Sequence, residues 1–183
     1  MRFFRNFFRP PNGQDTTHLT DGEIRLVLRQ YQWGSEYVGR LPCYFFSIVP
    51  EGGMRAELGR CDLRMGMHDE IYFAGHIGYR IYRQYRGHHY AEKASRLLLH
   101  FANELGMEEV IITCDPDNQP SRHTLMNLSG ELRNTVTVPT DSACYRAGDR
   151  EKCQFYFHTK DYFKPEWHNE AVCTQPDYTD YSL

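Results

Sequence analysis

The stretch YRIYRQYRGHHYAEKASRLLLHFANELG, residues 79–106, decides how this sequence is interpreted. It begins with a strand-like pattern, passes through an Arg-Gly turn and continues as a long amphipathic segment. In that segment the apolar residues recur at the spacing of one helical face, and Gly106 stands where a glycine commonly ends a helix. The stretch therefore predicts a strand, a turn and a helix, and the backbone N–H groups at a helix start suit an anion.

Composition limits the classes of protein that fit. With 183 residues and 40% hydrophobic content, the chain is long enough for one domain with a sizeable core. The formal net charge of -3 shows no basic excess, which argues against a nucleic-acid partner. No apolar run approaches the roughly 18 residues of a membrane span, so we expect no membrane partner. The six cysteines form no C-x-x-C pair, which favours free thiols and a reducing cytoplasm.

The flanking sequence predicts an α+β fold. Strands are expected at residues 24–28, 43–49, 54–65, 70–82, 110–114, 132–139 and 151–161. The second and third would pair as a hairpin, and Gly75 or Gly78 indicates a bulge or a close backbone approach within the fourth. A second helix is expected from about Asn118, with Pro120 in its first turn, until Gly130 stops it. The central order of strand, helix, strand and helix predicts a βαβ unit.

The two ends differ from the middle of the chain. We expect an aromatic and basic extension at residues 1–20, one domain at 21–163 and a tail at 164–183. The extension interleaves arginines with pairs of phenylalanines, a pattern found in segments that touch a membrane surface or direct targeting. The alternative, which we favour, is that these aromatics fold onto the domain or onto a second subunit, and this leaves a homodimer open.

The order of strand, R-G-x-x-Y-A turn, long helix, short strand and DPDNQPS resembles the GCN5-related N-acetyltransferase (GNAT) family. The segments GHIGYRIY, YRGHHYA, ITCDPDNQPS and GDREKCQFYF are also similar to a bacterial branch of predicted acetyltransferases. The resemblance covers about residues 24–161. It implies the GNAT acyl-CoA N-acyltransferase fold, an α+β fold in α/β/α layers whose mixed, largely antiparallel central sheet is flanked by helices.

In that family the turn and the following helix hold the pyrophosphate of acetyl-CoA, and an N-x-x-S motif lies beside the pantetheine and the thioester. The resemblance places the coenzyme at Ile81, Arg86, Gly87, His88, His89, Tyr90, Ala91, Asn118 and Ser121. The sequence departs from the family at His89, where glycine is usual, so we expect a right-handed conformation there with the side chain pointing away. The phosphate motifs G-x-x-x-x-G-K-[ST] and G-x-G-x-x-G are missing, which argues against kinase and dinucleotide functions.

Three sets of side chains have an alternative interpretation. His88 and His89 could be metal ligands with His76, Cys114 or His123, but adjacent side chains diverge on a turn and no metal-ligand spacing supports them. We therefore expect no metal. The resemblance puts Asn118 beside the coenzyme, and its position also suits a helix N-cap. Cys114 ends an apolar strand, which favours a buried thiol over a nucleophile.

Acetyl transfer to an amine needs a proton acceptor, donors to the carbonyl oxygen and an acid for the departing thiolate. The resemblance places a tyrosine acid seven residues after Asn118, but that position is Leu125. A thiolate whose pKa lies near 8.5 can depart without one. His76 stands where related enzymes often carry a glutamate, and an ordinary histidine pKa near 6.5 suits a general base; a buried, hydrogen-bonded histidine is the alternative. Asp69 and Glu70 are weaker candidates.

The residues that bind the acceptor amine are the part of the site that the sequence indicates least clearly. In this fold it is bound by segments that correspond here to QYQWGSEYVGRLP and TDSACYRAGDREKC. Tyr31, Trp33, Tyr37 and Glu36 could line a pocket for a small amine, or could be packing residues. We expect an acetyl-CoA-dependent N-acetyltransferase that acts on a primary amine of a small molecule or peptide. The alternatives are a coenzyme A-binding module without activity, which Leu125 keeps open, and an interaction protein that uses the aromatic N-terminus.

Overall fold

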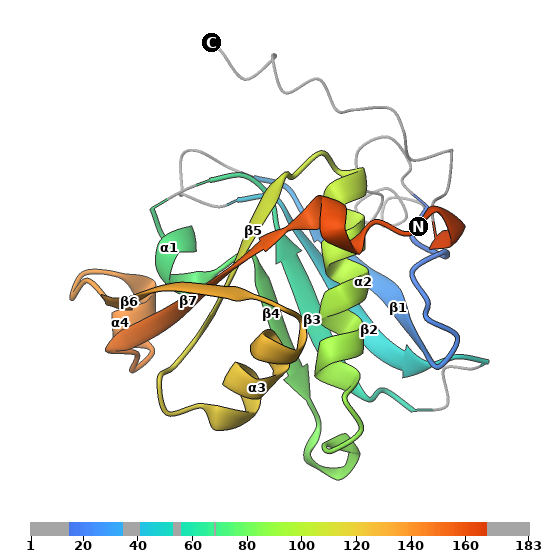
Figure 1. Ribbon diagram of the computed structural model, residues 1–183, viewed down its shortest axis with the longest axis horizontal. Coiled ribbons are helices and arrows are strands. Elements are labelled where there is room, and N and C mark those ends of the chain that lie inside the picture. The colour runs from blue at the N-terminus through green and yellow to red at the C-terminus, as the bar shows by residue number, and fades with distance from the viewer. Residues whose placement is uncertain (1–14, 35–40, 53–55, 68, 168–183) are drawn as a thin grey trace, which may run out of the picture.

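The computed structural model describes residues 15–34, 41–52, 56–67 and 69–167, and their strands form two antiparallel sheets (Figure 1). The first sheet has the order β1-β2-β3-β4 and consists of β1 (Ile24–Gln32), β2 (Cys43–Pro50), β3 (Gly59–Arg64) and β4 (Ile77–Ile81). The second has the order β5-β7-β6 and consists of β5 (Glu109–Cys114), β6 (Glu131–Thr137) and β7 (Glu151–His158). The predicted α+β fold is confirmed, as is the β2–β3 hairpin.

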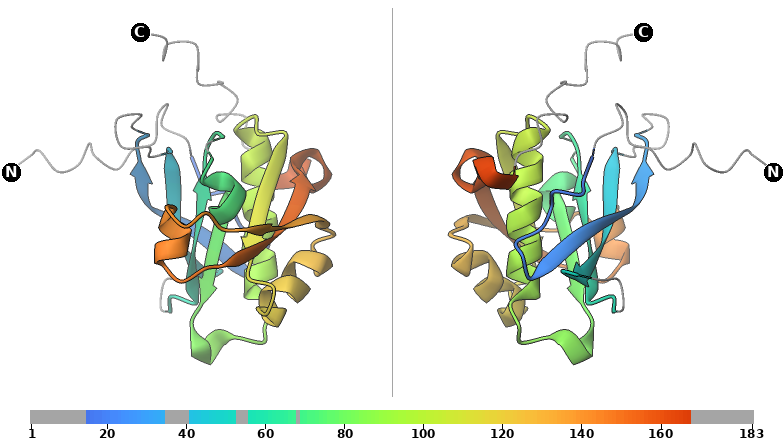
Figure 2. Two further views of the ribbon diagram at one scale, coloured as in Figure 1. Left: turned by 90° about the vertical axis from the view of Figure 1, so that its left-hand side faces the viewer. Right: turned by 90° about the vertical axis from the view of Figure 1, so that its right-hand side faces the viewer.

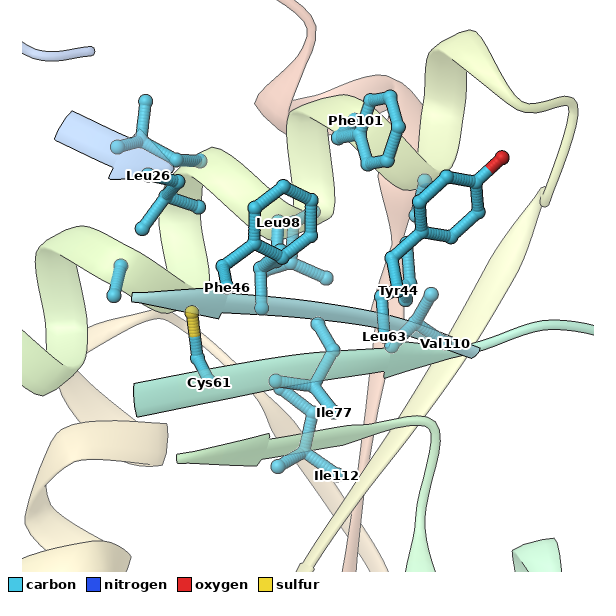
Figure 3. Packing of buried hydrophobic residues seen from close by; sticks show 14 of the residues in the cluster. Leu26, Tyr44, Phe46, Cys61, Leu63, Ile77, Leu98, Phe101, Val110 and Ile112 are labelled. Carbon is cyan, nitrogen blue, oxygen red and sulfur yellow. The ribbon is translucent and has the colours of Figure 1, made fainter. Parts of the chain in front are cut away.

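The long helix is α2 (Tyr90–Glu104), and it lies against one face of the first sheet (Figure 2). Its buried stripe includes Leu98 and Phe101, which point toward Phe46 and Tyr44 of β2 (Figure 3). The Phe101 ring meets the Tyr44 ring edge-on, with centroids 5.1 Å apart. Burying such side chains contributes about 1.5 to 3 kcal/mol each, so this face holds the domain together.

The predicted end of the long helix near Gly106 and the predicted start of the second helix near Asn118 are confirmed. The shorter helices are α1 (Ile71–Ala74), α3 (Gln119–Asn127) and α4 (Ala143–Arg146), with 3-10 turns η3 (Arg83–Tyr85), η4 (Thr159–Tyr162) and η5 (Pro165–Trp167). After α2, Gly106 has a φ of 78° and donates to Asn103 O, while Met107 donates to Ala102 O, the hydrogen bonds of a Schellman cap. After α3, Ser129 takes the left-handed conformation with a φ of 62°, so Gly130 is not the residue that ends this helix.

The predicted strand at residues 70–82 is wrong in its first half, where the chain forms α1. Gly75 causes the change of direction, because its φ of 73° is left-handed. A Cβ atom there would lie 3.0 Å from Thr113 N and 3.1 Å from Ile111 O, so the expected close backbone approach is confirmed at this glycine. Within the described residues, β4 and β5 share no hydrogen-bonded ladder, and the predicted βαβ unit therefore does not form one continuous sheet.

The N-terminal residues that the structure describes pack onto the domain. Leu19 is fully buried in the core, and Leu26 N donates to Leu19 O at 2.9 Å. The predictions about residues 1–14 and about 168–183 lie outside the described residues. None of the described helices has the length and apolar character needed to cross a membrane. The five described cysteines are free thiols, as predicted, and Cys173 lies outside the described part.

Candidate functional site

A cavity of about 770 Å³ opens where β4 and β5 diverge. Its walls come from β4, the turn before α2, the first turn of α2, the end of β5 and α3, with further residues from the end of β3, α1, α4 and the start of β7. Eight of the nine residues predicted to hold the coenzyme line it: Ile81, Arg86, Gly87, His89, Tyr90, Ala91, Asn118 and Ser121. His88 does not line the cavity, and its ring stacks on Tyr90 instead, with centroids 5.5 Å apart.

The turn before α2 has the shape of an anion-binding turn. Gly87 and His89 both have positive φ, 88° and 58°. The expectation of a right-handed conformation at His89 is therefore wrong: the residue takes the left-handed conformation, and histidine is among the residues that tolerate it. The imidazole is exposed and lies 3.5 Å from Glu92. No side chain caps this helix start, so its first N–H groups have no acceptor from the cap residue, and His89, Tyr90 and Ala91 line the cavity.

Arg86 supplies positive charge at the same turn. The side chain is exposed, and its Nε donates to Ile81 O at 3.2 Å. This bond connects the arginine to the end of β4 and holds the guanidinium beside the helix start. A full positive charge, a helix N-terminus and backbone N–H groups together favour a phosphate, and charge-assisted bonds are the stronger class of hydrogen bond.

The opposite wall is the start of α3. Asn118 caps the helix, as predicted, because its Oδ1 accepts from Ser121 N at 3.2 Å. The Ser121 hydroxyl forms a 2.7 Å hydrogen bond with the hydroxyl of Tyr79 on β4. Sequence analysis did not select Tyr79, although a tyrosine hydroxyl on an otherwise apolar strand face needs a partner when buried. Leu125, at the position of the missing acid, is fully buried in the core.

The far end of the cavity is formed by residues with charged side chains that sequence analysis did not select. Lys152 lies between two carboxylates, with its Nζ 2.6 Å from Asp115 and 2.9 Å from Asp149. Burial lowers the pKa of Lys152, but these hydrogen bonds raise it by more, so the ammonium stays charged. Arg64 also lines this end, and it is paired with Asp62 at 2.9 Å.

One of the two segments expected to bind the acceptor reaches the cavity. Cys144, Asp149 and Lys152 of the segment 140–153 line its far end. Tyr31 and Trp33 do not line it: their rings meet edge-on 5.0 Å apart, and Tyr31 packs on Tyr44. Glu36 and Tyr37 lie outside the described residues.

His76 is placed behind the cavity wall rather than on it, and it is 4% exposed. Its Nδ1 accepts from Ile111 N at 2.9 Å, and its Nε2 lies 3.1 Å from Gly66 O, to which it donates. Burial lowers the pKa of His76, so the ring is held neutral. Both ring nitrogens are used by the backbone, and this geometry leaves the imidazole no lone pair with which to take a proton from an amine.

The histidines considered as metal ligands do not gather. In the described part of the chain, the only group of three with ligand atoms within 4.8 Å of one another is His18, His100 and Glu104, and it contains none of the proposed ligands. His100 Nδ1 accepts from Lys164 N at 3.2 Å, so a neutral ring carries its proton on Nε2, the nitrogen that faces Glu104. A protonated Nε2 offers no lone pair to a metal ion.

Cys114 lines the cavity but is a poor nucleophile. Burial is the main reason that the pKa of its thiol rises to about 11, so the thiol is neutral near pH 7. This supports the expectation of a buried thiol.

Comparisons with known proteins identify the family and the fold. The model of the acetyltransferase (GNAT) domain matches residues 2–129. Similar solved structures include a GNAT-family acetyltransferase from Bacillus anthracis (TM-score 0.50, 17% identity, 63% of this chain and 66% of that one). Another is a ribosomal-protein-S5-alanine acetyltransferase from Vibrio fischeri (TM-score 0.52, 15% identity, 67% of this chain and 64% of that one). A third is a microcin C7 self-immunity acetyltransferase in complex with acetyl-CoA and AMP (TM-score 0.50, 14% identity, 63% of this chain and 61% of that one). The chain thus spans just under two thirds of each of these proteins. No curated protein matches the sequence.

Proposed function

The chain belongs to the GNAT acetyltransferase family, and we propose that it transfers an acetyl group from acetyl-CoA directly to a primary amine of a small molecule or peptide. The observation that carries this proposal is the meeting of the anion-binding turn and the Asn118–Ser121 motif in one cavity. The first suits the pyrophosphate of the coenzyme, and the resemblance to the family puts the second beside the thioester. The free buried thiols favour a reducing, cytoplasmic setting.

The cavity also gives the two substrates separate approaches. Coenzyme would enter from the turn before α2, so that its thioester reaches the Ser121 hydroxyl. The amine would enter from the far end, past Arg64 and Lys152. The amine nitrogen then forms a bond to the acetyl carbon, the carbon–sulfur bond breaks with its electron pair on sulfur, and the ammonium proton passes to water. No protein nucleophile is needed, in keeping with the neutral Cys114 thiol.

A second function is a coenzyme A-binding module without transfer activity. The buried Leu125 favours it, because it occupies the position where many members of the family have a tyrosine as the acid. Both functions need the turn before α2 to bind the coenzyme, and they differ only in whether the protein transfers the acetyl group.

Acetyl-CoA should raise the melting temperature. Ligand at about 100 times its dissociation constant stabilises the folded state by about 2.7 kcal/mol, which corresponds to roughly 5 to 10 °C for a chain of this size. Differential scanning fluorimetry with millimolar acetyl-CoA, and with inorganic phosphate as control, measures the shift; thiol release across a panel of primary amines then separates the two functions. An unchanged melting temperature would contradict both.

Arg86→Ala should weaken coenzyme binding by about 1 to 3 kcal/mol, because it removes a charge-assisted phosphate contact from an exposed turn. Isothermal titration calorimetry with coenzyme A gives the affinity, and the unfolding midpoint should stay within about 0.5 kcal/mol of the wild type. Arg83→Ala is the matched control, since Arg83 is exposed in the same turn but does not line the cavity. Equal affinities for the two variants would place the pyrophosphate elsewhere.

A further inference from the structure

We propose that Asp62 of β3 takes the proton from the acceptor amine during acetyl transfer. This inference rests on the proposed function, and it gives the proton a protein acceptor on its way to water. His76 cannot serve as this acceptor, because the backbone engages both of its ring nitrogens.

Asp62 lies on the sheet face opposite to α2. Its neighbours Cys61 and Leu63 belong to the buried core and point toward the helix (Figure 3). Because side chains alternate along a strand, Asp62 and Arg64 point to the other face. Gly78 of β4 is the register partner of Asp62, and both Gly78 and Arg64 line the cavity. Asp62 is therefore placed beside two residues of the cavity wall.

Gly78 leaves the space that the carboxylate occupies. A Cβ atom at this position would lie 2.7 Å from Asp62 Oδ1 and 3.2 Å from Asp62 Oδ2. Because glycine has no side chain, nothing on Gly78 stands between this carboxylate and the cavity. The Asp62 side chain is 19% exposed, so a small amine, or one water molecule next to it, can come within hydrogen-bonding distance.

The carboxylate has unused acceptor capacity. Arg64 Nη2 lies 2.9 Å from Asp62 Oδ2 in an ion pair, while Nη1 of the same guanidinium donates to Gly75 O at 3.0 Å. Within the described residues, Oδ2 is buried and has no hydrogen-bond partner apart from this ion pair. An ionised carboxylate accepts about four hydrogen bonds, so lone pairs remain for an N–H of the substrate.

The environment of Asp62 suits a proton acceptor. Burial raises the pKa of this carboxyl from its ordinary value of 3.8, by more than the charge of Arg64 lowers it. A carboxylate with a raised pKa is a stronger base, and it acts best when its pKa approaches the working pH. The shift therefore improves Asp62 as a base and leaves it able to release the proton again.

The neighbouring titratable groups do not compete for the proton. Burial raises the pKa of the Cys43 thiol on β2 to about 12 and that of the Cys61 thiol on β3, so both thiols are neutral near pH 7. The other groups on this face of β3 and β4 are arginines: Arg64, and the exposed Arg60 and Arg80. Guanidinium groups stay protonated and cannot accept a proton.

The reaction then runs without a further reactant. The neutral amine forms a bond from its nitrogen lone pair to the acetyl carbon, and its N–H becomes acidic as positive charge develops on nitrogen. That proton passes to the Asp62 carboxylate. The carbon–sulfur bond breaks with its electron pair on sulfur, and Asp62 afterwards releases the proton to water, which restores its charge.

Asp62→Asn should lower kcat for the best amine of the panel by about 100-fold, because the amide keeps the shape of the side chain but cannot take the proton. KM for acetyl-CoA should change by less than about threefold, since the turn before α2 is untouched. Glu57→Gln is the matched control. Its carboxylate also lies beside an arginine of β3, but its partners Arg60, Ser47 and Tyr82 do not line the cavity.

The pH profile of kcat gives a readout that a structural role would not change. A base acts only when it is ionised, so wild-type kcat should fall as the pH drops through the raised pKa of Asp62. Protonation of the substrate amine lowers the rate of every variant at acid pH. Only proteins with Asp62, the wild type and Glu57→Gln, should show the additional acid limb.

Rescue by a small carboxylate tests the same role directly. Formate fits the space that Asp62→Ala opens, and it should raise kcat of this variant by about tenfold while leaving the wild type and Glu57→Gln unchanged. Sodium chloride at equal ionic strength is the salt control. Gly78→Ala is a second variant that keeps Asp62: its Cβ displaces the carboxylate, so kcat should fall by about tenfold, and should fall no further when Asp62→Asn is added.

The outcomes distinguish this inference from the proposed function. If Asp62→Asn keeps kcat within about threefold of an active wild type, or if formate does not rescue Asp62→Ala, Asp62 is not the proton acceptor and the proposed function stands. Should Asp62→Asn fail to fold, wild-type kcat in Gly78→Ala overturns the inference in the same way. A wild type that binds coenzyme but acetylates no amine overturns the proposed function, and this inference with it.

Discussion

Glu104→Ala should lower the free energy of unfolding by about 2 to 6 kcal/mol, because it removes the carboxylate that two imidazoles contact, and each buried polar group left unpaired costs about 1 to 3 kcal/mol. Glu104 ends α2, and its side chain is fully buried. Its carboxylate lies 2.8 Å from His18 Nε2 and 3.3 Å from His100 Nε2. The group thus ties the N-terminal segment to the end of α2, and removing the carboxylate leaves two imidazoles facing each other in the core. Urea denaturation measures the change.

The same carboxylate predicts an acid limit to stability. Burial raises the pKa of Glu104, but the hydrogen bonds and charges of His100 and His18 lower it by more, to about 2, against an ordinary value of 4.5. The folded-state pKa is therefore the lower one. Its contribution to stability is complete above pH 4.5 and is lost as the pH falls from about 4.5 to 2, by on the order of 3 kcal/mol.

The control is Glu108→Gln, four residues further on, where the side chain is exposed. Urea midpoints recorded between pH 2 and 7 should show a shallower acid decline for Glu104→Gln than for Glu108→Gln, which should follow the wild type. Parallel declines for both variants would show that the cluster is not the source of the acid sensitivity.

The parts of this fold that sequence predicts well are those with local causes. In α2 the apolar residues recur at helical spacing and Gly106 ends the helix, so the helix can be predicted from the sequence. The start of α3 at Asn118 could also be predicted from local sequence, because the capping side chain and the N–H from which it accepts are only three residues apart. Sequence analysis therefore identified the cavity-lining residues at the starts of these two helices.

The parts that sequence analysis missed depend on contacts between distant segments. Tyr79 was not selected from the sequence, because only the folded chain shows that its hydroxyl meets that of Ser121, 42 residues later. Lys152 becomes part of the site because β7 runs beside β5, a register that no local pattern predicts. The left-handed conformation of His89 is likewise set by the turn as a whole, against the preference of the residue.

His76→Ala should lower the free energy of unfolding by about 2 to 4 kcal/mol and should not reduce kcat at temperatures where the variant is folded. The reason is the position of His76 between the two sheets. The backbone N–H of His76 donates to Ile111 O at 2.7 Å, and the ring Nδ1 accepts from Ile111 N at 2.9 Å. The substitution removes the second of these bonds. A buried N–H without a partner costs about 1 to 3 kcal/mol, and loss of the ring adds a cavity. Thermal denaturation and thiol-release assays on the same preparation give both quantities.

The alternative for His76, the general base expected from its place before the turn, predicts the opposite pair of results. A base contributes about 10² to 10⁴ in rate, so its removal would lower kcat by at least about 100-fold while the stability change stayed small.

His76→Asn separates the structural role from the catalytic one, because an amide oxygen can still accept from Ile111 N–H but is far too weak a base to take a proton from an amine. Partial recovery of stability in His76→Asn, relative to His76→Ala, with kcat at the wild-type level identifies the residue as the joint between β4 and β5. His158→Ala, an exposed histidine on β7, should change neither quantity. If His76→Asn is stable but inactive, proton removal belongs to His76 after all, and its ring must leave the hydrogen bond to Ile111 during turnover.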